Sequence, residues 1–250
     1  RSAHQAVLKA QEYVQSGRVY VVDVDLEKFF DRVNHDVLMS RLESRIRDQR
    51  VLCLIRRYLQ AGMLANGMMV DRHEGTPQGG PLSPLLANVL LDEVDRALEK
   101  RGHYFVRYAD DCNVYVRSHQ AGERVLAGLR ALYGKLRLKL NEAKSAVAKA
   151  TERKFLGFSF YRYKGQVKRC VARKAVQAYK DRVRQLTRRS GGKSIEQVVE
   201  KLRTYQLGWK NYFRLSETPR VFLGLDEWLR HRLRVIHLKH WKRGKTAYAE

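Results

Sequence analysis

Residues 105–116 of this chain read Phe-Val-Arg-Tyr-Ala-Asp-Asp-Cys-Asn-Val-Tyr-Val, two short β-forming runs around an acidic pair. The apolar alternation on both sides of Ala109 predicts a β-hairpin with Asp110 and Asp111 at its turn. Aspartate is also common in tight turns for conformational reasons, because its side chain caps the turn backbone. The acidic pair alone therefore leaves two interpretations open, an ordinary turn or part of a metal-binding centre.

A second β-forming segment, residues 19–26, carries two further aspartates. Asp23 and Asp25 are two residues apart, so they lie on the same face of a strand. Three carboxylates within about 4 Å would repel one another by about 4 kcal/mol per pair at an effective dielectric of about 20, and a divalent cation removes that cost. An upstream aspartate together with Asp110 and Asp111 would therefore suit two Mg²⁺ ions in a centre for phosphoryl transfer.

The bulk composition indicates a polyanionic partner. The chain has 250 residues, 44% of them hydrophobic, and no apolar run approaches the length of a membrane span. Its net charge of +24 and isoelectric point near 10.2 exceed what solubility requires, so nucleic acid is the expected partner and a membrane is not. Residues 151–250 hold 26 Lys and Arg against 8 Asp and Glu, whereas residues 1–150 hold 24 against 18. The phosphate-binding charge is therefore expected in the second part.

The cysteines and the chain ends give weaker indications. Cys53, Cys112 and Cys170 are far apart in the sequence, which favours neither a disulfide framework nor a cysteine zinc site. A reducing, bacterial-type cytoplasm is the expected compartment, with the protein associated with the nucleoid or a ribonucleoprotein. The first residues, Arg1-Ser2-Ala3-His4, read as the middle of a longer protein, so we expect a fragment.

Strand-like and helix-like segments are intermixed without a regular βαβ rhythm, which predicts an α+β fold. A Gly/Pro-rich loop leads into a helix over residues 83–100, with Ser83 as its N-cap and Gly102 as its stop. The later pattern predicts a hairpin turning at Lys164-Gly165 and then a module of three helices. The hairpin strands are expected over residues 155–163 and 166–172, and the helices over residues 175–189, 194–215 and 226–241.

The segment that contains Asp25 resembles a known motif. Asp25-Leu26-Glu27-Lys28-Phe29-Phe30 is similar to the first palm motif of reverse transcriptases, an aspartate followed after four residues by an aromatic. Asp23 has no aromatic residue at the same offset and is interpreted as a strand-end acid at the rim of the pocket. The resemblance implies that Phe30 acts as a steric gate that selects deoxynucleotides.

The same resemblance implies the identity of the metal ligands. It assigns Asp25, Asp110 and Asp111 to two Mg²⁺ ions, with Mn²⁺ as an alternative, and makes the backbone carbonyl of Leu26 a further ligand. The three carboxylates are accordingly the expected catalytic residues.

Two further stretches resemble nucleotide-binding motifs of this family. The loop Thr76-Pro77-Gln78-Gly79-Gly80-Pro81-Leu82-Ser83-Pro84 is similar to the signature that packs near the incoming nucleotide, so Gln78 and Gly79 are expected to contact it. Asn141-Glu142-Ala143-Lys144 is similar to the motif whose lysine approaches the triphosphate. The alternative for Lys144 is that of most lysines in turns, a solvated charge.

A fourth stretch, Phe155-Leu156-Gly157-Phe158, resembles the motif that grips the 3′ end of the primer. The resemblance implies that Phe155, Leu156 and Gly157 contact the primer, with the glycine allowing close approach of its backbone. An aromatic hairpin that only packs against the rest of the protein is the competing interpretation.

The last third of the sequence indicates which group of reverse transcriptases the chain resembles. Gly208-Trp209-Lys210-Asn211-Tyr212-Phe213, followed by a basic helix with Trp228, is similar to the maturase-specific thumb domain of group II intron reverse transcriptases. This implies a right-hand polymerase palm with partial fingers over residues 1–163 and a three-helix, all-α thumb or maturase domain over residues 164–250. Trp209, Tyr212 and Trp228 are interpreted most simply as core residues. The arginines expected to contact RNA are Arg182, Arg184, Arg188, Arg189, Arg203, Arg232 and Arg234.

The resemblance implies an RNA-directed DNA polymerase that extends a DNA primer with dNTPs on an RNA template. It also implies binding of group II intron RNA, which assists splicing (maturase activity) and retromobility. Two alternatives remain open: a non-catalytic RNA-binding splicing factor, and a domesticated reverse transcriptase serving defence or repair. The sequence does not define which intron RNA is bound, the oligomeric state, or activity without the N-terminal fingers expected to be missing before Arg1.

Overall fold

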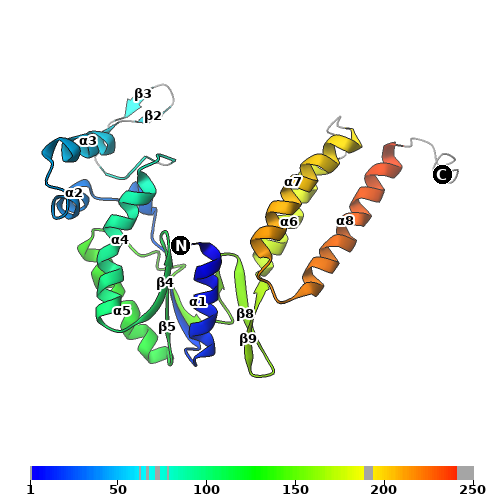
Figure 1. Ribbon diagram of the computed structural model, residues 1–250, viewed down its shortest axis with the longest axis horizontal. Coiled ribbons are helices and arrows are strands. Elements are labelled where there is room, and N and C mark those ends of the chain that lie inside the picture. The colour runs from blue at the N-terminus through cyan, green and yellow to red at the C-terminus, as the bar shows by residue number, and fades with distance from the viewer. Residues whose placement is uncertain are drawn as a thin grey trace. The chain divides into compact units, whose positions relative to one another are not determined.

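The computed structural model in Figure 1 describes residues 2–61, 63–65, 68–70, 74–77, 79–188 and 194–240. The chain divides into two compact units between Arg153 and Lys154. This division comes earlier than the expected functional boundary after residue 163, because the strands that follow Arg153 group with the C-terminal helices. No helix among the described residues is both long and apolar enough to cross a membrane.

The first unit is built on an antiparallel sheet with strand order β4-β5-β1-β6. The predicted hairpin is present, since Tyr108 pairs with Asp111 across a two-residue turn. The central strand β1 pairs with β5 on one side and β6 on the other, with Val24 facing Cys112. The four strands are β1 (Tyr20–Val24), β4 (Tyr104–Tyr108), β5 (Asp111–Val116) and β6 (Ala146–Lys149).

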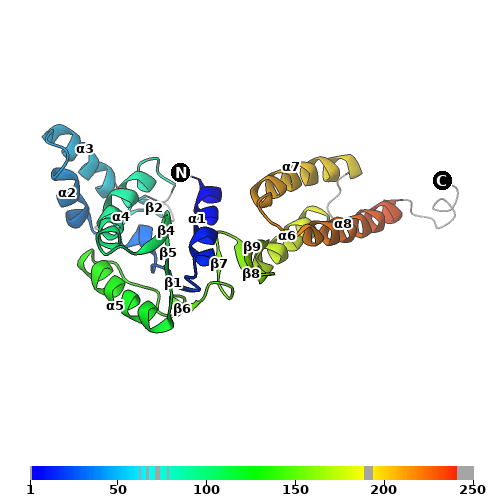
Figure 2. The ribbon, with the colours of Figure 1, turned by 60° about the horizontal axis from the view of Figure 1, so that its bottom comes forward.

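Helices cover both faces of this sheet. Helix α1 lies on one face, and α4 and α5 lie on the other (Figures 1 and 2). Helices α2 and α3 pack near α4, and a short 3₁₀ turn, Phe29–Asp31, follows β1. The elements are α1 (Ala3–Gln15), α2 (His35–Glu43), α3 (Gln49–Gln60), β2 (Met63–Ala65), β3 (Met68–Val70), α4 (Ser83–Lys100) and α5 (His119–Lys135).

Burial on both faces explains the composition of the central strands. Val24 and Cys112 belong to the core shared with α4 and α5, whereas the Tyr115 ring on the other face contacts the Tyr13 ring of α1. Strand β5 is therefore buried after its first residue, and its buried side chains are apolar except that of Asn113. The polar residue Asp111 is confined to its exposed first position.

The start of α4 differs slightly from expectation. We expected Ser83 as the N-cap, but the helix begins at Ser83 and Leu82 takes the cap position. The Ser83 hydroxyl instead donates to the carbonyl of Pro77 at 2.6 Å, which ties the Gly/Pro-rich loop to the helix. The predicted stop is correct, because the helix ends at Lys100 and Gly102 adopts a φ of +68°.

The second unit combines a small antiparallel sheet with three helices, as the α+β prediction requires. The hairpin at Lys164-Gly165 is confirmed, with φ values of +49° and +79°. Expecting one strand over residues 155–163 was wrong, because a second turn at Leu156-Gly157 interrupts it. The elements are β7 (Lys154–Phe155), β8 (Phe158–Tyr163), β9 (Gln166–Val171), α6 (Arg173–Leu186), α7 (Ile195–Phe213) and α8 (Pro219–His240).

The last helix also begins earlier than the sequence pattern indicated. Helix α8 starts at Pro219 rather than near residue 226, because proline fits the first turn of a helix, where an N–H lacks a partner anyway. The three helices share one apolar core. Its buried members are Tyr179, Val183, Val198, Leu202, Leu225 and Leu229.

Candidate active site

The backbone segments that carry Asp25 and the Asp110-Asp111 pair lie side by side at one end of the first sheet. Val24 pairs with Cys112, so Asp25, the next residue, continues the antiparallel register opposite Asp111. Asp110 lies in the two-residue turn that joins β4 to β5. The backbone therefore places the predicted catalytic residues on adjacent segments.

The side chains of these aspartates are accessible. The carboxylate of Asp25 is 37% exposed and lies 3.4 Å from the ammonium of Lys144. Within the part of the chain that the structure describes, no three acidic, His or Cys side chains are grouped closely enough to hold a metal ion. Carboxylate oxygens are donors of the kind that Mg²⁺ prefers, and binding of the ion by these three residues stays a prediction.

A third segment fixes the backbone of Asp25. The Asn141 N–H donates to the Asp25 carbonyl at 2.9 Å, and the Glu27 N–H donates to the Lys139 carbonyl at 2.9 Å. The Ser145 hydroxyl lies 3.1 Å from the Asp25 nitrogen and 3.2 Å from its carbonyl oxygen. Asp25 is therefore held through its backbone, while its carboxylate is paired with Lys144.

The same contacts bear on the Leu26 carbonyl, the predicted fourth ligand. Leu26 forms an isolated antiparallel bridge with Leu140, in which Asp25 and Glu27 make the hydrogen bonds. In such a pair the carbonyl of the middle residue faces the opposite side of the strand. The Leu26 carbonyl is therefore directed to the side where β5 and the Asp110 turn lie.

Asp23 has different surroundings from Asp25. It pairs in register with Asn113, whose amide nitrogen, in the orientation that satisfies both groups, lies 3.0 Å from the Asp23 carboxylate. The guanidinium of Arg153 lies 3.6 Å from the other carboxylate oxygen. Asp23 is thus paired with Arg153 and Asn113, and its interpretation as a non-catalytic acid stays a prediction.

The Gly/Pro-rich loop is anchored beside Phe30. The Thr76 N–H donates to the Phe30 carbonyl at 2.7 Å, and His35 Nε2 lies 2.7 Å from the Gly75 carbonyl. Gly75 has a φ of +87°, and a Cβ there would lie 2.8 Å from the carbonyl oxygen of Asp31. The close approach that glycine permits at this position is to the protein's own backbone.

Two of the residues predicted to bind nucleotide belong to or follow this loop. Gln78 lies outside the described residues, whereas Gly79 is exposed with a φ of +80°. Phe30 is partly buried, and its ring centroid lies 5.1 Å from that of Phe29. Their contacts with a nucleotide stay predictions.

The predicted primer-grip residues form a tight turn. Phe155 is buried, and Leu156 and Gly157 both have positive φ, at +49° and +79°. The Tyr212 hydroxyl donates to the Leu156 carbonyl at 3.0 Å, and a Cβ on Gly157 would lie 3.1 Å from the Phe213 ring. Packing within the second unit therefore accounts for this glycine, and primer contact remains a prediction.

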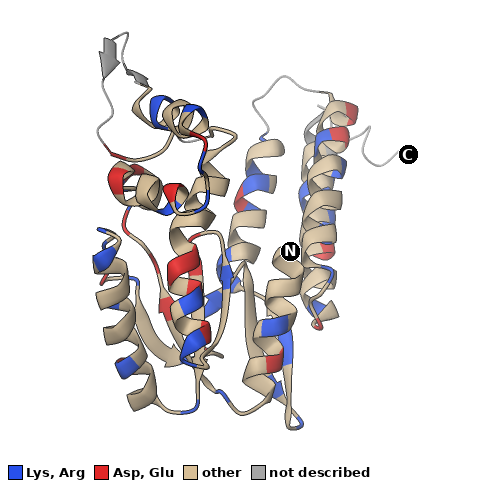
Figure 3. Ribbon diagram, turned by 60° about the vertical axis from the view of Figure 1, so that its left-hand side comes forward, with Lys and Arg blue, Asp and Glu red and all other residues tan. Residues whose placement is uncertain are grey.

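The helices of the second unit carry Lys and Arg along their length (Figure 3). Trp209 packs against the helical core, as expected, with ring centroids 4.7 Å from Tyr179 and 4.6 Å from Phe213. Expecting Tyr212 in the core was wrong, because its side chain is 36% exposed and its hydroxyl reaches the Leu156 carbonyl. Arg189 lies outside the described residues. Arg232 is partly buried, and the other predicted RNA contacts are exposed, namely Arg182, Arg184, Arg188, Arg203 and Arg234.

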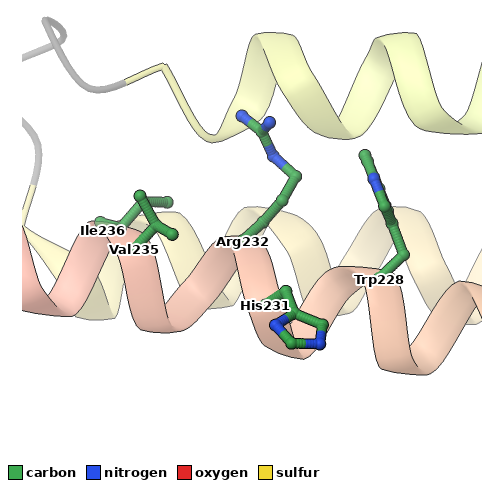
Figure 4. A pocket seen from close by; sticks show the side chains of 5 residues that line it. All are labelled: Trp228, His231, Arg232, Val235 and Ile236. Carbon is green, nitrogen blue, oxygen red and sulfur yellow. The ribbon is translucent and has the colours of Figure 1, made fainter.

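Trp228 lies at a pocket on α8 that Arg232, His231, Val235 and Ile236 also line (Figure 4). Side-chain cations of Lys180, Arg184 and Arg232 lie 5.6–5.7 Å from the centroid of its ring. Such distances allow cation–π attraction. Trp228 also packs against the helical core, so it combines the predicted structural role with a cationic surrounding.

Sequence reasoning missed the residues that support the site. Ser145 holds the Asp25 backbone, and Arg107 joins the aspartate turn to Asp95 of α4. A signal for Arg107 was present in the sequence, since it is a charged residue within an apolar strand next to the turn. Its partner Asp95 could not be predicted, because Asp95 belongs to α4, which contacts this strand only in the folded protein.

Comparison with known proteins identifies both parts of the chain. A family profile described as reverse transcriptase (RNA-dependent DNA polymerase) matches residues 1–160. A second, described as the group II intron maturase-specific domain, matches residues 176–249. The stretch between the two profiles leaves the functional boundary open.

Two curated relatives share parts of the sequence. Protein YkfC of Escherichia coli K12 is 36% identical over 105 residues, which are 40% of this chain and 28% of that protein. The group II intron-encoded protein LtrA of Lactococcus lactis is 33% identical over 142 residues, which are 56% of this chain and 24% of LtrA. The chain spans about a quarter of the length of these relatives.

A solved structure shares the fold. Telomerase from Candida albicans, in complex with the TWJ fragment of telomeric RNA, aligns with a TM-score of 0.52 and 15% identity, covering 96% of this chain and 49% of that chain. This likeness concerns the architecture and agrees with the predicted right-hand α+β fold. The chain therefore belongs to the reverse transcriptase family, and within it to the group II intron proteins that carry a maturase-specific domain.

Proposed function

We propose that this chain catalyses RNA-directed DNA synthesis and binds group II intron RNA as a maturase. The observation that supports the first part is that the segment carrying Asp25 lies beside the Asp110-Asp111 turn at one end of the first sheet. These carboxylates, with the Leu26 carbonyl, would hold two Mg²⁺ ions, which lower the pKa of the primer 3′-hydroxyl and neutralise charge on the leaving pyrophosphate. The primer hydroxyl would attack the α-phosphate of a bound dNTP.

The residues around the aspartates would position the nucleotide. Lys144 is an exposed cation on a flexible side chain, 3.4 Å from the Asp25 carboxylate, and would pair with the charge of a triphosphate. Phe30 lies next to the start of the anchored loop, at Gly75-Thr76, where its ring would meet the 2′ position of the sugar. Primer contact by Phe155, Leu156 and Gly157 belongs to the same proposal.

Binding of intron RNA rests on the second unit. Its excess of Lys and Arg over Asp and Glu gives residues 151–250 a net charge of +18, from 26 basic and 8 acidic residues. Exposed arginines on α6, α7 and α8 offer bidentate donors to phosphates, which favours RNA backbone over a neutral partner. The match to the maturase-specific profile supports intron RNA as that partner.

The test is incorporation of dNTPs into a DNA primer on an RNA template with Mg²⁺. Asp110→Asn is expected to abolish extension, because it removes a ligand charge, and to leave RNA affinity unchanged. Asp23→Asn is the matched control and should retain extension, since Asp23 is neutralised by Arg153 and faces Asn113. Extension that survives Asp110→Asn would contradict the assignment of the site. RNA binding without any incorporation by the unaltered protein would favour the splicing-factor alternative.

A further inference from the structure

The side chain of Arg107 hydrogen-bonds to the turn that carries Asp110. The guanidinium of Arg107 donates to both carboxylate oxygens of Asp95, with Nε at 2.8 and 3.0 Å. Its NH1 nitrogen donates to the Asn88 side-chain oxygen and to the Ala109 carbonyl, both at 2.9 Å. Asn88 and Asp95 belong to α4, so a single planar side chain connects that helix to the turn.

The contact with Ala109 falls where the backbone is strained. Ala109 has a φ of +53°, in the left-handed region that residues with a Cβ rarely adopt. Such a conformation persists only where surrounding contacts hold it. Because the Ala109 carbonyl belongs to the peptide bond that leads into Asp110, the bond from Arg107 fixes the plane from which the Asp110 side chain departs.

The Arg107 side chain is largely shielded from solvent and paired with Asp95. Its side chain is 11% exposed, and its strand partner Cys112 is fully buried. Burial alone would lower the pKa of Arg107, but the hydrogen bonds and charge of Asp95 outweigh burial and raise it. Asp95 therefore both neutralises the guanidinium and orients its fork. This differs from Lys144, which is 66% exposed and pairs directly with Asp25.

We propose that Arg107 and Asp95 form a clamp that presets the Ala109-Asp110 turn for metal binding. Both are positioning residues, since they act through the turn and do not touch the reacting atoms. The inference deepens the proposed function and rests on it where polymerisation is concerned. A turn held in this way should show slow amide exchange and tighter Mn²⁺ binding, and both can be measured without catalysis.

The first measurement is hydrogen–deuterium exchange over residues 105–113 in the metal-free protein. Arg107→Lys keeps the charge but loses the two-sided fork, so exchange in this segment should rise by about tenfold, as expected for local opening. Arg45→Lys is the matched control. Arg45 forms a surface ion pair with Asp92 of α4, the helix that also carries Asp95, and does not contact the turn. Exchange that is equal in Arg107→Lys and Arg45→Lys would overturn the clamp.

The second measurement is Mn²⁺ affinity, followed by electron paramagnetic resonance. Loss of an outer support of a metal ligand typically weakens binding by about 10- to 100-fold, so Arg107→Lys should raise the half-saturating Mn²⁺ concentration by at least about tenfold. In primer extension kcat should fall, while KM for dNTP stays within about twofold. A purely structural pair would lower the melting temperature and leave Mn²⁺ affinity unchanged, which would contradict the proposal.

A milder variant covers the case in which Arg107→Lys does not fold. Asn88 is exposed and shares the NH1 nitrogen with Ala109, so Asn88→Ala should fold and weaken Mn²⁺ binding in the same direction, to a smaller extent. Unaltered Mn²⁺ affinity in a folded Asn88→Ala protein, together with unaltered exchange at the turn, would overturn the proposal. If the unaltered protein incorporates no dNTP yet these two readouts respond as expected, the proposed polymerase function fails and the clamp stands.

Discussion

Asp23 and Asp25 lie on the same strand face, yet their neighbours give them different roles. Asp23 faces Asn113 and lies 3.6 Å from the guanidinium of Arg153, whereas Asp25 follows the end of the strand pairing and lies 3.4 Å from the ammonium of Lys144, whose side chain is 66% exposed. Both acids are paired with a cation, and they differ in the exposure of that partner, since the Arg153 side chain is only 31% exposed. We therefore expect a metal ion to displace Lys144 from Asp25 more readily than Arg153 from Asp23.

At this scale, Phe30→Ala tests the steric gate. Removal of the ring should open space for a 2′-hydroxyl and raise the ratio of ribonucleotide to deoxynucleotide incorporation by about tenfold or more. The measurement is kcat/KM for each nucleotide in primer extension. Phe30→Tyr keeps the ring and should preserve the selectivity. Unchanged sugar selectivity in Phe30→Ala would contradict the gate assignment.

Gly75→Ala tests the loop anchor. Its added Cβ would combine an unfavourable positive φ with an approach of 2.8 Å to the Asp31 carbonyl oxygen. The free energy of unfolding should fall by about 1–3 kcal/mol, measured by urea denaturation of the first unit. Gly17→Ala is the matched control, with a φ of +89° and nothing within 4 Å of its Cβ, and should cost less. Equal losses would show that the clash has no effect.

At the scale of elements, alternation and turn chemistry predicted the aspartate hairpin and the Lys164-Gly165 hairpin. The turn at Leu156-Gly157 was missed, because an aromatic run around a single glycine reads as one continuous strand. The supports of the site were missed for a different reason. Ser145 and Asp95 act across tertiary contacts that local pattern does not encode.

The joint between β9 and the start of α8 gives a pH-dependent prediction. Partial burial raises the pKa of Glu217, but hydrogen bonds and charge from Arg169, with the charge of Lys168, outweigh it, so the pKa lies below its ordinary value. A folded-state pKa below the unfolded one, about 4.3, stabilises the fold above that pH, and the benefit is lost as pH falls through the folded value.

Glu217→Gln should therefore lower the melting temperature of the protein at neutral pH and make it less dependent on pH in the acid range. Calorimetry from neutral pH down to about pH 3 would measure both effects. The exposed Glu227→Gln on α8 is the control and should behave as the unaltered protein. A melting profile of Glu217→Gln that tracks the unaltered protein across this range would refute the ion-pair contribution.

At the scale of the whole molecule, charge is divided between the units. The acids that suit metal chemistry lie in the first, and the excess of basic residues lies in the second. RNA affinity should therefore fall steeply with salt, by a slope of about 0.7–0.9 per phosphate contact on logarithmic axes. The sequence alone predicted this division, because it depends on composition and not on packing.

The double variant Arg184→Gln, Arg234→Gln should lower the slope of log affinity for intron RNA against log salt concentration by the amount expected for the loss of about one or two phosphate contacts. Filter binding across a salt series would measure this slope. Both side chains are exposed on the second unit, so the fold should persist. Arg96→Gln, an exposed residue of α4 in the first unit, is the control. An unchanged slope in the double variant would place the RNA contacts elsewhere.

The central claim, that Asp25 with Asp110 and Asp111 forms a divalent metal centre, is tested most directly by titrating Mn²⁺ into the metal-free protein and following bound ion by electron paramagnetic resonance. We predict that Asp25→Asn weakens Mn²⁺ binding by at least about tenfold, whereas Asp23→Asn, two residues away on the same strand face, changes it by less than about twofold. Equal affinity in the unaltered protein and Asp25→Asn, or a comparable loss in both variants, would contradict the account.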